Sequence, residues 1–383
     1  MLYEIHMLKN YPPANLNRDD TGMPKTCYFG GAQRGRISSQ CLKRAWRKSS
    51  LFDDLLGPLG FRTRKLPELV AKNLVERDIP EKIAQAVRKP LSKIAITDKG
   101  TGSDDEGSVN RKKGKDEELI TKQTIFCSND DITAIADAVK ALLEKNGMEG
   151  DKIKADDILG QIKDADIRPI TLDIALFGRM VTSKGFINIE AAVQTAHAIS
   201  THAVNSESDY FTAVDDIISQ TDVTDRGAAH LDATDYNSCC YYHYIAIDTN
   251  VLKRNLINSP EAQNLMDKVL PAFIQIMAYT DPSGKQNSFA SHVLPELLCV
   301  EVKEKKIPVS YANAYATPVP FLASGKLIEN SVKALIEEID RIDENYGLEV
   351  KHRFWFCPRI KDMQPRKCEI AQNMGELLIK CRQ

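Results

Sequence analysis

The strongest constraint on the fold is a run of residues late in the chain, 239–248, with the sequence CCYYHYIAID. It is rich in aromatic and β-branched side chains and ends beside Asn250 in a turn-like setting, so it predicts a β-strand. Two further strands are predicted at 2–9, shortly before Pro12-Pro13, and at 296–303. The predicted sheet therefore combines segments that lie far apart in the sequence.

Helical patterns fill most of the chain between these strands. Apolar residues recur at three- and four-residue steps in 39–50, 68–88, 131–145 and 190–204, and 326–345 reads as an amphipathic helix ahead of Gly347. Strands separated by helices predict an α+β domain of the ferredoxin or RNA-recognition-motif type, with a helical insertion after the first helix.

Composition narrows the class of protein. Of 383 residues, 43% are hydrophobic and 27% are charged, which is typical of a globular protein with a large core. The formal net charge of −2 argues against a histone-like nucleic-acid binder, so any contact with a polyanion needs a local basic surface. The nine cysteines form no CxxC pair, which predicts reduced thiols. Because no signal-peptide pattern or long apolar run is found, we expect a cytoplasmic protein without membrane contact.

Residues 97–118 are glycine-rich and highly charged, with Val109 as the single clearly apolar residue. Such a stretch buries too little surface to offset its ordering entropy, so it predicts a mobile insertion loop. Its RKKGK run is interpreted as solvated surface.

The most informative region is a basic segment, 21–52, which holds seven basic residues and no acidic one. Ser38 or Ser39 can cap a helix that runs to about Ser50, with Leu42, Ala45 and Trp46 on its packing side. Basic residues four apart on this helix repel each other unless an anion lies between them. The free N–H groups at the helix start suit phosphate, and the upstream glycines permit close approach of a ligand. The segment therefore favours phosphate binding over a merely solvated basic face.

The longer stretch NLNRDDTGMPKTCYFGGAQRGRISSQCLKRAWRKS resembles the N-terminal signature of the CasC-type backbone subunit of the type I-E CRISPR Cascade complex. The resemblance continues in the same order through DIALFGRM (173–180), TAHAISTHAV (195–204), DYFTAVDD (209–216), GAAHL (227–231) and PSGKQNSFASHVLPE (282–296), and it is weakest at 55–165. It implies a subunit that binds the guide RNA (crRNA), polymerises head to tail along it and presents it for pairing with target DNA. The implied partners are crRNA, the target DNA strand, other copies of the chain, and the guide-processing, cap, large and small subunits.

The resemblance also implies a hand-like architecture. The palm would comprise 1–58, 196–206 and 238–383, the helical fingers 59–195 including loop 97–118, and the thumb hairpin 207–237. The RNA contacts it implies are Arg18, Lys25, Arg34, Ser38, Gln40, Lys43, Arg44, Arg47, Lys285, Gln286 and Asn287. Met180 would be an apolar wedge beside the kinked RNA, and Phe211 and Thr212 would lie near the displaced nucleotide. Without the resemblance, Met180 and Phe211 would be taken as core residues, and Lys285 to Asn287 as an ordinary turn.

The sequence contains none of the common enzyme motifs that were considered. The chain has no GxxxxGK[ST], GxSxG or HExxH, and its histidines do not fall at metal-ligand spacing. We therefore expect no catalytic residues, no metal and no cofactor, and we expect His197 in the core or an interface. The main alternative is a subunit similar to the type III backbone, which would cleave target RNA through Asp19 and Asp20 holding Mg²⁺. A free-standing RNA-binding protein that acts as a monomer or dimer is the third alternative.

Overall fold

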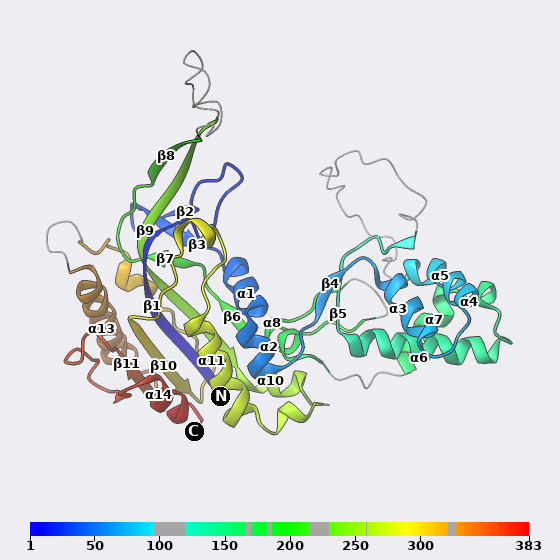
Figure 1. Cartoon of the computed structure of the whole chain (residues 1–383). Coiled ribbons are helices and arrows are strands. Elements are labelled where there is room, and N and C mark those ends of the chain that lie inside the picture. The colour runs from blue at the N-terminus through cyan, green and yellow to red at the C-terminus, as the bar shows by residue number, and fades with distance from the viewer. Residues whose placement is uncertain are drawn as a thin grey trace, which may run out of the picture. The chain divides into compact units, whose positions relative to one another are not determined.

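The computed structural model describes residues 1–94, 119–164, 170–181, 186–213, 230–257, 259–320 and 326–382 (Figure 1). The chain divides into two compact units. The first comprises Met1–Leu56, Val193–Asn250 and Asn264–Gln383, and the second comprises Gly57–Ala192 and Val251–Gln263. The predicted mobile loop, 97–118, lies outside the described residues, and the boundaries of palm, fingers and thumb stay predictions.

A large mixed sheet forms the centre of the first unit, with the strand order β12-β11-β10-β1-β9-β7-β3-β2. Its strands are β1 (Leu2–Ala14), β2 (Thr26–Phe29), β3 (Ala32–Ile37), β7 (Ala198–Ser200), β9 (His230–Asp248), β10 (Leu297–Lys303), β11 (His352–Phe356) and β12 (Glu369–Ile370). Two more strands, β6 (Val193–Thr195) and β8 (Glu207–Ala213), pair with β9. The α+β class and the three predicted strands are confirmed.

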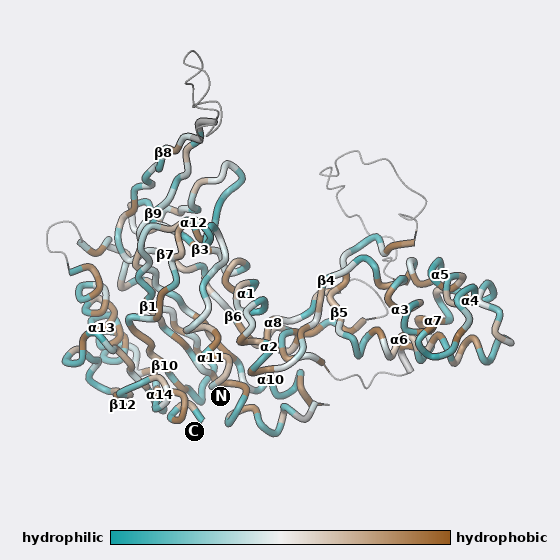
Figure 2. Tube along the Cα trace, viewed as in Figure 1, coloured by the Kyte–Doolittle hydropathy of each residue, from teal (hydrophilic) through white to brown (hydrophobic). Residues whose placement is uncertain are grey.

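Helices of the first unit pack on this sheet. They are α1 (Ser39–Lys48), α2 (Ser50–Leu56), α11 (Leu270–Tyr279), α13 (Leu327–Tyr346) and α14 (Met374–Lys380), with the short α12 (Gln286–Phe289) and η5 (Tyr311–Tyr315). Helix α13 is amphipathic, as Figure 2 shows by its alternating colours, and its apolar side packs on Leu8, Tyr242 and Trp355. Trp46 of α1 meets Phe273 of α11 edge to face, with ring centroids 6.0 Å apart.

The second unit is mainly helical. It contains β4 (Phe61–Thr63), α3 (Leu66–Val75), α4 (Glu81–Ala86), α5 (Arg88–Lys93), β5 (Ile125–Cys127), α6 (Asn129–Lys145), η2 (Gly150–Lys152), α7 (Ala155–Asp164) and α8 (Leu172–Phe177). Helix α6 begins at a capping box in which Ser128 and Asp131 bond each other's backbone N–H groups. Helix α10 (Thr249–Asn255) crosses from the first unit into the second, where η3 (Pro260–Ala262) follows; η4 (Leu265–Val269) precedes α11.

One predicted helical segment was wrong, and another forms two helices, α3 and α4, instead of one. The segment 190–204 forms β6 and β7, because its backbone pairs with β9; the Ala196 N–H, for example, donates to the Tyr244 carbonyl. The segment 68–88 is interrupted where Asp78 adopts a positive φ of 67° and Pro80 follows. Sheet pairing and a proline thus override a helical spacing of apolar residues.

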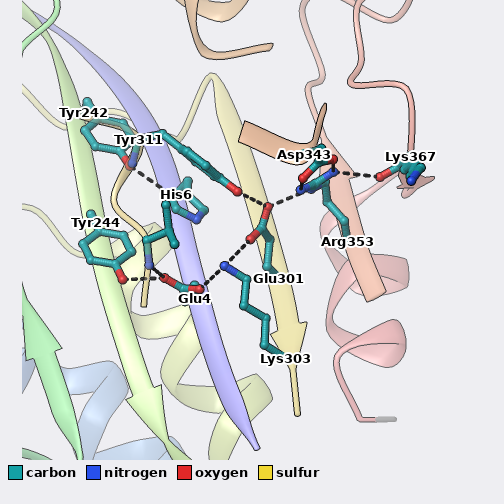
Figure 3. A network of polar contacts seen from close by, with 11 residues as sticks. Glu4, His6, Tyr242, Tyr244, Glu301, Lys303, Tyr311, Asp343, Arg353 and Lys367 are labelled. Carbon is teal, nitrogen blue, oxygen red and sulfur yellow. Dashed lines mark hydrogen bonds and ion pairs between the residues drawn. The ribbon is translucent and has the colours of Figure 1, made fainter. Parts of the chain in front are cut away.

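Charged side chains are buried together within the sheet of the first unit (Figure 3). Lys303 of β10 forms ion pairs with Glu4 of β1 and with Glu301, the latter at 3.1 Å. Glu301 also accepts hydrogen bonds from Arg353 at 2.7 Å and from the Tyr311 hydroxyl at 2.9 Å. Removing one partner of such a buried pair costs about 3–5 kcal/mol, because the other charge is left uncompensated.

Two buried histidines of the sheet are held neutral. Burial lowers the pKa of His6 to about 3, and its Nδ1 lies 2.8 Å from the Tyr242 hydroxyl. Burial, with a smaller effect of Lys9, also lowers the pKa of His243 to about 3. Neither ring nitrogen of His243 has a hydrogen-bond partner among the described residues.

None of the described helices is long and apolar enough to cross a membrane. All nine cysteines are free thiols.

Candidate nucleic-acid interface

The loop between β1 and β2 is fixed by its own polar side chains. Asn17 Oδ1 accepts the Ser38 N–H at 2.9 Å, and the Asn17 carbonyl accepts the Lys25 N–H at 2.8 Å. Asp19 Oδ1 accepts the N–H groups of Thr21 and Met23 and the Thr21 hydroxyl. These bonds, that of the Thr21 hydroxyl first, lower the pKa of Asp19. Asp19 is therefore an ionised residue that closes the loop.

Helix α1 has a buried side and an exposed side, and the basic residues of the segment are divided between the two. Ser38 is the N-cap, as predicted, and its Oγ accepts the Cys41 N–H at 3.3 Å. The first turn contains no acidic residue. Arg47 is buried beside Leu42 and Trp46, which makes it a poorer candidate for RNA contact than the exposed Arg44.

The remaining predicted contacts on this helix differ in exposure. Gln40 is exposed, whereas Lys43 is half-buried and burial lowers its pKa. Lys48, which was not among the predicted contacts, is exposed on the same side as Arg44. Its spacing already indicated this contact, because Lys48 stands four residues after Arg44 and therefore on the same helix face.

Arg18, Arg44 and Lys48 line one cleft of about 680 Å³ in the first unit. None of the three forms an ion pair with another described residue. Asp281 also lines the cleft, but its carboxylate already accepts from Lys9 at 2.6 Å, Tyr11 at 2.7 Å and the Val293 N–H at 3.0 Å. Oδ1 of Asp19 and both carboxylate oxygens of Asp281 are thus engaged within the protein, and the exposed Asp20 also lines the cleft. The three cations outnumber the acidic side chains that lack such bonds, so the cleft can take an anion.

The predicted GKQN loop lies beside this cleft. A Cβ on Gly284 would come 2.3 Å from the Leu16 carbonyl oxygen, so the two backbones are in close contact. Lys285 has a left-handed φ of 50° and Asn287 is exposed, whereas Gln286 donates back to the Pro282 carbonyl at 3.0 Å. The structure thus brings the 282–287 segment and the loop between β1 and β2 together. Their contact with RNA stays a prediction.

Arg34 does not fit its predicted contact with RNA. Its side chain is fully buried, and its guanidinium donates to the carbonyls of Ser200 (3.0 Å), Thr201 (2.9 Å) and Tyr315 (2.7 Å). With these bonds made inside the protein, the side chain cannot reach a phosphate. Its role is to join β3, the end of β7 and η5.

Met180 lies in the second unit and is 92% exposed, so it is not a core residue. The neighbouring Arg179 is buried and pairs with Asp131 at 2.8 Å, which fixes the backbone at this point. Met180 and Phe177 line a hollow of about 710 Å³. An exposed thioether on an anchored backbone fits the predicted wedge, which stays a prediction.

The β8–β9 hairpin carries the other predicted contacts. Phe211 is 43% exposed and Thr212 is exposed, so Phe211 is not a core residue either. Tyr210, absent from the prediction, is 64% exposed. The tip of the predicted thumb, 214–229, lies outside the described residues. The base of the hairpin meets α12, where the rings of Tyr236 and Phe289 lie 5.8 Å apart.

His197, expected in the core or an interface, is exposed at the start of α1. Its Nδ1 accepts the Ser39 N–H at 3.1 Å. Burial, Arg36 and Lys25 lower its pKa, so the neutral ring is favoured. No group of three or more histidine, cysteine or acidic residues in the described part of the chain is placed to hold a metal ion.

A family model described as CT1975-like protein matches residues 3–379. The chain belongs to the CT1975-like protein family. No curated protein matches it.

Among solved structures, a chain of a "CRISPR RNA-guided surveillance complex, pre-nicking" is similar with a TM-score of 0.81 and 26% identity, covering 100% of both chains. A second chain, from a "CRISPR RNA-guided surveillance complex", has a TM-score of 0.70 and 23% identity, covering 100% of this chain and 99% of that chain, and supports the fold alone. The resemblance to CasC-type subunits that the sequence suggested is confirmed.

Proposed function

We propose that this CT1975-like chain is the guide-RNA-binding backbone subunit of a type I-E Cascade surveillance complex. The observation that carries the proposal is the cleft lined by Arg18, Arg44 and Lys48, none of which forms an ion pair within the described part of the chain. In a chain with a net charge of −2, three cations that line one cleft favour an anionic ligand at that place. The similarity to chains of CRISPR RNA-guided surveillance complexes supports a guide RNA as that anion.

The backbone of the RNA follows the loop between β1 and β2, helix α1 and the GKQN loop. Phosphates are neutralised by the exposed cations, and this attraction does not depend on sequence, as a subunit that carries many different guides requires. The bases remain free to pair with the target DNA strand. Met180 and the exposed aromatic residues of β8 supply apolar surface for unstacked bases.

A palm of the RNA-recognition-motif type is part of the proposal. The strand order β10-β1-β9-β7, with α1 after β1 and α11 between β9 and β10, supports a βαββαβ arrangement. Copies of the chain would join head to tail through two different surfaces, alongside the guide-processing, cap, large and small subunits.

The chain acts in this proposal by binding, without catalysis. The cleaving alternative depends on Asp19 and Asp20, and Oδ1 of Asp19 already accepts three hydrogen bonds from Thr21 and Met23. With this oxygen committed to the loop, the pair has fewer carboxylate oxygens to offer Mg²⁺.

The experiment measures how many copies bind one RNA. The purified chain and its companion subunits are mixed with guide transcripts of increasing length, and the mass of the complex is determined after size-exclusion chromatography. We expect the number of copies to rise with RNA length, whereas one copy on every RNA would contradict the proposal. Incubation with Mg²⁺ and complementary RNA tests the alternative, since regularly spaced cuts that are lost in Asp19→Ala would establish cleavage.

A further inference from the structure

The hairpin β2–β3 is held rigidly at its turn. Gly30 and Gly31 have φ values of +59° and +76°, which suit a tight two-residue turn between Phe29 and Ala32. A Cβ on Gly30 would lie 1.6 Å from the Ala316 carbonyl oxygen, so the turn is seated directly against the backbone after η5. Only glycine fits at this position.

Arg34 fixes the same hairpin from its buried side. Besides its bonds to β7 and η5, its Nε donates to the Phe29 carbonyl at 3.3 Å, and its guanidinium lies 5.9 Å from the centre of the Phe29 ring. The hairpin is therefore anchored at several points by one residue that cannot itself reach a ligand.

Tyr28 lies on the outward side of this anchored hairpin and is 82% exposed. It stands opposite Gln33, which is also exposed and whose side-chain amide donates to the Thr26 hydroxyl at 3.2 Å. An aromatic ring that gains so little from burial contributes almost nothing to folding. Its surroundings point to a ligand.

The charge around Tyr28 selects the kind of ligand. No acidic residue occurs between Asp20 and Asp53, whereas Lys25 and Arg36 meet at the base of the hairpin, where the Arg36 N–H donates to the Lys25 carbonyl at 2.8 Å. Tyr28 lies three positions after Lys25, roughly 10 Å along the backbone at about 3.3 Å per residue, and at this spacing the two side chains leave opposite faces of the hairpin. A flat ring on a segment that is rich in cations and free of acidic residues suits a polymer with an anionic backbone and planar bases.

We propose that Tyr28 is a stacking platform for one unpaired base of the RNA that the proposed function places on the basic segment. Stacking on an aromatic face tolerates any base, which fits a guide whose sequence varies. The rigid hairpin presents the ring in one position, so little conformational freedom is lost on binding. The other candidate occupant, a second copy of the chain, is less favoured because the segment that carries the ring, 21–52, holds seven basic residues and no acidic one.

The test compares Tyr28→Ala with Tyr28→Phe in the full chain, and uses Tyr346→Ala as a matched control at another exposed tyrosine (66%). The measured quantity is affinity for a single-stranded RNA short enough to bind one copy, at several salt concentrations. We expect Tyr28→Ala to weaken binding about five- to hundredfold, as found for other base–aromatic stacks. The slope of affinity against salt should stay unchanged, and Tyr28→Phe and Tyr346→Ala should bind like the wild type.

Three results would overturn the proposal: unchanged affinity in Tyr28→Ala, a reduced salt slope, or a loss seen only with RNA long enough for several copies. A reduced slope would assign Tyr28 to positioning a phosphate contact, and the length-dependent loss would assign it to contact between copies. Failure of the wild-type chain to bind RNA would instead refute the proposed function, so the two failures are distinguishable.

Discussion

Gly284→Ala tests whether the GKQN loop belongs to the RNA-binding surface without removing any charge. The added methyl group would come 2.3 Å from the Leu16 carbonyl oxygen and 2.7 Å from that of Asn15, whereas ordinary contact begins at 3.4 Å. The two backbones must therefore separate by about 1 Å, the difference between the first and last of these distances. Such overpacking costs about 1–3 kcal/mol of stability.

The same shift moves the loop away from a bound phosphate. Losing one hydrogen bond to a charged group costs about 1.5–3 kcal/mol, so we expect guide RNA to bind about ten- to hundredfold more weakly. The salt slope should fall by about 0.7 for the lost phosphate contact. Filter binding at several salt concentrations measures both quantities, and urea unfolding confirms that the variant is folded.

Gly160→Ala is the matched control, because a Cβ at Gly160 has no neighbouring atom within 4 Å. It should bind RNA like the wild type. If Gly284→Ala also binds with wild-type affinity and slope, the loop does not take part in the interface.

Two further predictions concern stability. Arg34→Met leaves three buried carbonyls without their donor, at about 1–3 kcal/mol each, and should lower the urea midpoint far more than Arg44→Ala does. Equal midpoints would show that Arg34 does not hold β3, β7 and η5 together. Since the folded-state pKa values of His6 and His243 are lowered to about 3, the unfolded chain binds more protons below pH 6.5. The free energy of unfolding should therefore fall by about 1.4 kcal/mol per pH unit for each histidine on acidification from pH 6.5. Urea unfolding of His243→Phe should show a pH dependence that is smaller by the contribution of one histidine. An unchanged pH dependence in this variant would contradict the burial argument.

Local sequence patterns were sufficient for three strands of the sheet, β1, β9 and β10, and for the start of α1. The aromatic and β-branched residues of 239–248 predicted a strand, and Ser38 before a polar, basic helix predicted its cap. The segment 190–204 misled because its alanines favour a helix, and its pairing with β9 depends on residues about 45 positions away, which no local pattern reveals.

For the site, the sequence identified basic residues but not their burial. Arg34 and Arg44 look equivalent in the sequence, yet Arg34 lies on the inward side of a strand and Arg44 on the outward side of a helix. Burial in 32–37 does not follow strand alternation, since Arg34, Gly35 and Ile37 are all buried while Arg36 is half-buried, so no local pattern distinguished Arg34 from Arg44. The contact of Gly284 with Leu16 joins segments far apart in the chain and follows only from the fold.

The most direct test of the central claim is the salt dependence of guide-RNA affinity in single-alanine variants of the cleft. Arg44→Ala and Lys48→Ala should each reduce the slope of log affinity against log salt by about 0.7. Lys361→Ala, an exposed lysine outside the cleft, should leave it unchanged. Equal slopes for the wild type and all three variants would show that the RNA backbone does not lie in the cleft.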